Sequence, residues 1–89
     1  METHILIYDY VDDLLERRAP FREAHLEAIR SARERGQLTL AGAVGDPPHG
    51  GMLVFQGVSP EEIDAYARRD PYMEAGLIQD YRIERWNLV

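Results

Sequence analysis

Two residue types are absent from the 89-residue sequence, which contains no cysteine and no lysine. Without cysteine there can be no disulfide bond and no thiolate-bound zinc, and we expect a cytoplasmic protein. Without lysine every strong cation is an arginine, so a bound anion would meet a planar, forked guanidinium. No apolar run is long enough to span a membrane, and the N-terminal residues lack the basic region of a secretion signal.

Positive charge is also scarce, because 10 basic residues are outnumbered by 16 acidic ones and the formal net charge is −6. This balance argues against broad nucleic-acid binding, which requires a basic face. Three scattered histidines do not form a metal-binding pattern, so we predict neither a metal nor a cofactor. The length suits one domain over residues 1–89, and a core this small often needs a second copy for stability.

The apolar pattern and the turn residues divide the chain into strands and helices. We predict strands at 3–10, 37–44, 52–58 and 77–89, a helical turn at 14–18, and long helices at 20–35 and 60–70. Ser59, Pro60 and Glu62 form a capping box at the start of the second long helix. The order β-α-β-β-α-β is typical of the ferredoxin-like α+β fold, an antiparallel sheet with both helices on one face.

Both faces of this sheet carry apolar side chains. In the first strand Ile5 and Ile7 point one way, whereas Leu6 and Tyr8 point the other way. Two helices can cover only one face, and a bare apolar face is an association surface. We therefore predict a homodimer in which two sheets pack face to face. The alternative is an apolar sheet with a short exposed edge.

His25 is a titratable residue in the apolar stripe of the first long helix, which Phe21 and Ile29 share at steps of four. Asp70 ends the second long helix, on the face of Ile63. Because both helices cover one sheet face, His25 and Asp70 can meet. A carboxylate on one ring nitrogen would leave the other nitrogen free to move a proton. In the alternative, His25 is a hydrogen-bonded core residue and Asp70 a turn residue before proline.

Several arginines surround this position. Arg22 lies nearly one turn before His25 and borders the same patch, so it is a candidate for binding an anion. We assign the other helical arginines to a solvated helix face, namely Arg18, Arg30, Arg33 and Arg35.

Five segments together resemble the YCII-related family of the dimeric α+β barrel superfamily. They are LERR, REAHL, RGQLTLAG, DPYMEAGL and the C-terminal RIERWNLV, in that order. The resemblance implies a single YCII-like domain, a dimer with a barrel-like core, and a site built on His25 and Asp70. It also implies a substrate contact at Arg17 and a pocket wall at Tyr72. Many relatives have proline where this chain has Ala43, so the resemblance does not specify the substrate.

Two functions fit these residues. The first is a small cofactor-independent enzyme of lyase or isomerase type, which transfers a proton on a small anionic carbonyl compound or lactone. His25 would act as general base or acid, Asp70 would orient it, and Arg17 or Arg22 would hold the anion. The alternative is a non-catalytic homodimer that binds a small anion without turnover, with His25 in a structural role.

Overall fold

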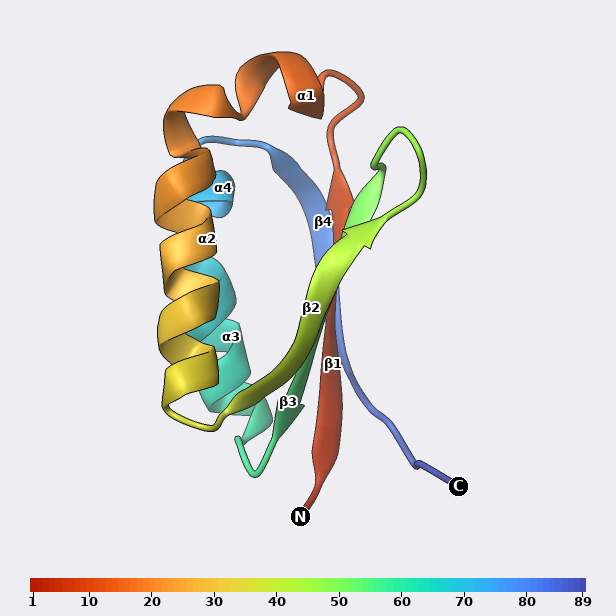
Figure 1. Cartoon of the computed structure of the whole chain (residues 1–89). Helices are drawn as coiled ribbons and strands as arrows, with labels where there is room; N and C mark the ends of the chain where they lie inside the picture. The colour runs from red at the N-terminus through yellow and green to blue at the C-terminus, as the bar shows by residue number, and fades with distance from the viewer.

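Four strands form one antiparallel sheet in the computed structural model, which describes residues 1–89. The sheet order is β2-β3-β1-β4 (Figure 1), with β1 at Thr3–Tyr10, β2 at Leu38–Val44, β3 at Gly50–Gln56 and β4 at Ile78–Arg85. Every neighbouring pair is antiparallel. The predicted ferredoxin-like α+β fold, the fold class of dimeric α+β barrels, is therefore confirmed.

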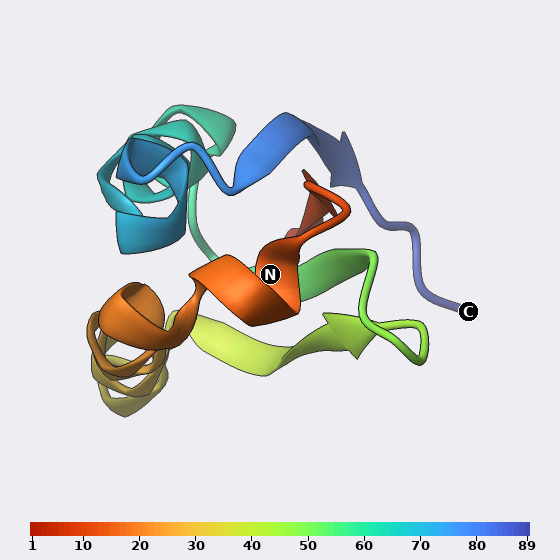
Figure 2. The ribbon, with the colours of Figure 1, turned by 90° about the horizontal axis from the view of Figure 1, so that it is seen from above.

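All the helices lie on one face of the sheet, as the view from above shows (Figure 2). They are α1 (Leu14–Arg17), α2 (Ala19–Glu34), α3 (Pro60–Arg69) and α4 (Pro71–Glu74). The bounds of the two long helices differ from the predicted ones by one residue, and α4 was not predicted. The last strand ends at Arg85 rather than Val89, because its partner β1 begins at Thr3 and has no further residue to pair. No helix is both long and apolar enough to cross a bilayer.

The core lies between the helices and the inner sheet face. Leu6 and Tyr8 are buried there, together with Leu53 and Ile63. Within α2 the predicted stripe is buried at His25, whereas Phe21 remains 37% exposed. The alternation along β1 and β3 places a second apolar set on the outer face, which no helix covers; it comprises Ile5, Ile7, Met52 and Val54.

Candidate active site

His25 and Asp70 are in direct contact in the core. α2 presents the imidazole toward the sheet, and Asp70 lies at the junction where α3 ends and α4 begins. The distance from His25 Nδ1 to Asp70 Oδ1 is 2.8 Å, and the Asp70 residue is only 1% exposed. The fold therefore brings together His25 and Asp70, the pair that the sequence pattern predicts to meet.

Local backbone structure fixes the position of the Asp70 carboxylate. Pro71 follows it and favours an extended conformation at Asp70, which has φ −61° and ψ 126°. In this conformation Asp70 caps α4, and its Oδ1 accepts the Tyr72 backbone N–H at 2.9 Å. Its Oδ2 accepts the Tyr8 hydroxyl at 2.9 Å. These contacts orient both carboxylate oxygens.

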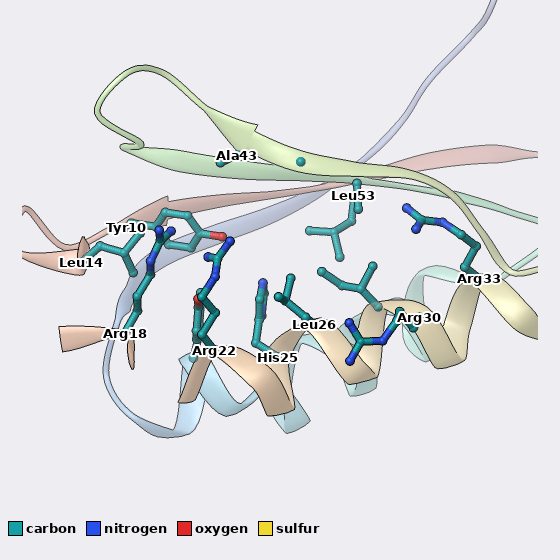
Figure 3. Close-up of a pocket in the computed structure, with 14 residues that line it drawn as sticks. Tyr10, Leu14, Arg18, Arg22, His25, Leu26, Arg30, Arg33, Ala43 and Leu53 are labelled. Atoms are coloured by element: carbon teal, nitrogen blue, oxygen red, sulfur yellow. The ribbon is translucent and has the colours of Figure 1, made fainter. Parts of the chain in front are cut away.

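Hydrogen bonding also selects the tautomer of the His25 ring. An ionised carboxylate can only accept, so Nδ1 must carry the proton that it shares with Asp70. The Tyr72 ring stacks on the imidazole with 3.8 Å between centroids and 3° between planes. Figure 3 shows the His25 side chain pointing from α2 into a cavity. Its Nε2 is therefore left as a proton acceptor on the cavity side.

This cavity has a volume of about 410 Å³ and lies between α2 and the inner faces of β2 and β3. That volume suits a small organic ligand. The lining is largely apolar, with cations along the helix side; it comprises Tyr10, Leu14, Arg18, Arg22, His25, Leu26, Ile29, Arg30, Arg33, Ala41, Gly42, Ala43, Leu53 and Tyr72.

The structure separates the predicted arginines. Arg22 lines the cavity, whereas Arg17 is absent from its lining and pairs with the exposed Asp13 at 3.4 Å. Arg18 lines the cavity in place of Arg17. Arg30 and Arg33 also line it, and both remain exposed, as the predicted solvated helix face requires, whereas Arg18 is half-buried.

A spacing signal could have found these lining arginines. Residues 18, 22, 25, 29 and 33 follow one another at steps of three or four, so they share one helical stripe with the histidine. The sequence prediction placed His25, Ile29 and Arg22 along this stripe, but not Arg18 or Arg33.

Two tyrosines between the sheet and the helices have strongly altered acidity. Burial, and then the charge of Asp70, raise the pKa of Tyr8 and of Tyr10 well above the ordinary value. Both hydroxyls therefore keep their protons. Gly51 leaves room for the Tyr10 ring, since a Cβ there would lie 2.6 Å from its hydroxyl oxygen. No group of three or more histidine and acidic side chains is arranged to hold a metal ion.

Comparisons with known proteins agree with this fold. The family model of the YCII-related domain matches residues 1–87 of this chain. No curated protein matches the chain.

Among solved structures, one similar protein is the 5-chloro-2-hydroxyhydroquinone dehydrochlorinase TftG from Burkholderia phenoliruptrix, in complex with 2,5-dihydroxybenzoquinone. It is 20% identical with a TM-score of 0.79, over 96% of this chain and 93% of that one. A putative antibiotic biosynthesis monooxygenase from Nitrosomonas europaea is 13% identical with a TM-score of 0.64, over 100% and 99%. Another from Deinococcus radiodurans is 11% identical with a TM-score of 0.58, over 100% and 93%. At these identities the likeness concerns the fold.

Proposed function

The chain belongs to the family of YCII-related domains, and we propose that it is a small cofactor-independent enzyme of lyase or isomerase type. The observation that carries the proposal is the 2.8 Å contact between His25 Nδ1 and the buried Asp70, beside a cavity of about 410 Å³. The reaction we propose is proton transfer on a small anionic carbonyl compound or lactone.

In this reaction His25 Nε2 takes a proton from the carbon next to the carbonyl group. The imidazolium that forms is stabilised by the Asp70 carboxylate, which Tyr8 and the Tyr72 N–H hold in place. The substrate becomes an enolate, whose negative charge lies where the Arg22 guanidinium can stabilise it. His25 then returns the proton to another atom in an isomerisation, or to a leaving group in an elimination.

Two residues complete the proposed site. Tyr72 forms part of the wall and holds the plane of the imidazole by stacking. Arg18 lines the cavity beside Arg22 and takes the role that the resemblance implies for Arg17, which is held by Asp13 outside the lining.

The dehydrochlorinase with the similar fold supports an elimination on an oxygenated ring. Its name describes the removal of hydrogen chloride from a chlorinated hydroxyhydroquinone, and its structure contains a dihydroxybenzoquinone. Such a reaction needs a proton acceptor next to an electron-rich ring and no nucleophile from the protein. Cyclic carbonyl compounds of that size also suit the present cavity.

We further propose that two copies associate through the outer face of the sheet, as the sequence predicts. Leu40 is 64% exposed on β2 and shares that face with Ile5 and Val54, through the register of the three strands. Pairing these faces would remove apolar surface from water. The cytoplasmic location stays a prediction.

The pairing of His25 with Asp70 can be tested without a substrate. An NMR titration of His25 in the wild type and in Asp70→Asn measures whether the carboxylate acts on the ring. We expect the midpoint of the His25 titration to differ between the wild type and Asp70→Asn. An unchanged titration would remove the pair from the proposed mechanism.

Catalysis is then separated from simple binding by His25→Ala. A thermal-shift screen with small carboxylates and lactones identifies ligands, and each ligand is assayed for turnover. We expect His25→Ala to fold and bind but to lose turnover, whereas His49→Ala, in the loop outside the cavity, keeps it. A His25→Ala protein of low stability that still binds, with a wild type that turns over no ligand, would favour the non-catalytic binding homodimer.

A further inference from the structure

Charge pairing divides the arginines of this chain into two groups. Five make ion pairs with acidic side chains, namely Arg17, Arg30, Arg68, Arg82 and Arg85. The other five make none. Arg18, Arg22 and Arg33 line the His25 cavity, and Arg35 and Arg69 line a second, smaller cavity between α2 and α3. Since 16 acidic residues are available, cations without an acidic partner that gather at cavities indicate binding of an anion from outside the chain.

Three of these cations line the His25 cavity, and they lie at two separate places along it. Arg18 and Arg22 lie on one side of His25 and Arg33 lies on the other, where Figure 3 shows it reaching from α2 toward the sheet. Three turns of helix separate Arg22 from Arg33, or about 16 Å along the axis between their Cα atoms. The cavity therefore has a positive charge at each end.

The surface between these two ends is apolar. Leu26 and Ile29 line it from the helix, and Leu53 lines it from β3. A carboxylate placed in this middle section would lose hydration without gaining a cationic partner, which is costly. An apolar ring or chain would be favoured there.

Arg30 also lines the cavity, but its charge is already neutralised. Its guanidinium donates to Glu23 at 2.6 Å and to Glu27 at 2.8 Å. Arg33, one turn further on, has no such partner. The free cation at this end of the cavity is therefore Arg33, and Arg30 serves as a matched control.

We propose that the substrate carries two acidic groups at opposite ends of an apolar body. Arg22 binds the acidic group next to the reacting carbon, and Arg33 binds the remote group. This inference rests on the proposed function, because it takes His25 as the position of the reacting carbon. Arg33 becomes a specificity-determining residue, since only a ligand with a second acidic group gives its guanidinium an ion-pair partner.

The test measures the affinity of the wild type for linear dicarboxylates from succinate to sebacate, and for the monomethyl ester of each. Each ester keeps the length of its diacid and removes one charge. Calorimetry at low ionic strength should show an optimal length at which the diacid binds about tenfold more tightly than its ester. Arg33→Gln should reduce this preference to about twofold or less, and Arg30→Gln should retain it.

Equal affinity for diacid and ester in the wild type would overturn the inference, as would a preference that survives in Arg33→Gln. Binding of neither series would also overturn it. The proposed function is judged separately, because the NMR titration of His25 requires no ligand. Arg33 is exposed, so its glutamine variant should fold, and circular dichroism checks that it does.

Discussion

At the scale of single residues, the Asp70 carboxylate is the group that holds the other polar groups of the site in position. It accepts hydrogen bonds from Tyr8, Tyr72 and His25, which explains why a titratable ring occupies an apolar helical stripe. The contact with His25 could be predicted, because both residues lie on helix faces that turn toward one sheet. The contact with Tyr8 could not be predicted. A tyrosine in a strand fits the apolar pattern of the core, and Asp70 lies 62 positions away in the sequence.

The Tyr8 hydroxyl should therefore stabilise the protein, whereas the Tyr66 hydroxyl should not. Tyr8→Phe removes a donor from a buried carboxylate, and we expect it to lower the free energy of unfolding by about 2 kcal/mol. Tyr66→Phe removes a buried hydroxyl that has no partner, so it should be neutral or stabilising. Urea denaturation at neutral pH measures both, and equal losses would contradict the role given to Tyr8.

Alkaline pH should destabilise the fold through its buried tyrosines. Burial, and then the charge of Asp70, raise the pKa of Tyr8, Tyr10 and Tyr66 above their ordinary value. Below a pH of about 10 both the folded and the unfolded states keep these protons, so the three groups add no pH dependence. Above it only the unfolded chain loses them, and stability falls by about 1.4 kcal/mol per pH unit for each tyrosine.

Denaturation curves measured as the pH rises above 10 test this expectation. The slope should be about 4 kcal/mol per pH unit for the three groups together, and Tyr66→Phe should reduce it by about a third. A variant whose slope matches the wild type would show that Tyr66 ionises equally in both states.

At the scale of elements, α2 supplies most of the chemistry, because a single stripe of that helix carries His25, Arg22 and Arg33. Helical periodicity places such residues on one face, but it does not reveal which arginine finds an acidic partner. Arg30 and Arg33 are alike in sequence terms, yet only Arg30 is held by Glu23 and Glu27. The short helix α4 was missed, although Asp70 followed by Pro71 is itself a helix-start signal.

The start of α3 gives an element-scale prediction, since there the sequence signal and the structure agree. Ser59 accepts the Glu62 backbone N–H at 3.2 Å, as the capping box predicts. Ser59→Ala should cost about 1 kcal/mol of unfolding free energy, because that N–H loses its acceptor. Ser59→Asn should restore most of the loss, measured by thermal denaturation. A Ser59→Asn protein as unstable as the alanine variant would argue against capping as the cause.

At the scale of the whole molecule, the family and the fold followed from the order of elements and motifs, and both are confirmed. The character of the outer sheet face was harder to predict, because it depends on strand order and register. β4 contributes Asp80, Arg82 and Glu84 to that face, opposite Asp9, Ile7 and Ile5. The outer apolar surface is therefore confined to β1, β2 and β3, and a partner should be centred over those strands.

Leu40 is the residue that best tests this partner surface, because it is the most exposed large apolar side chain in the sheet, at 64%. Leu40→Glu would bury an unpaired charge in each copy of a face-to-face dimer, at a cost of about 2 kcal/mol or more. We expect it to weaken dimerisation by at least about thirtyfold, measured by sedimentation equilibrium. Leu15→Glu provides the matched control, since Leu15 is 48% exposed on α1, on the helical side of the sheet. A dimer that survives Leu40→Glu and dissociates in Leu15→Glu would show that the copies associate through the helices. In that case the charge at position 15, and not the charge at position 40, would be buried in the interface.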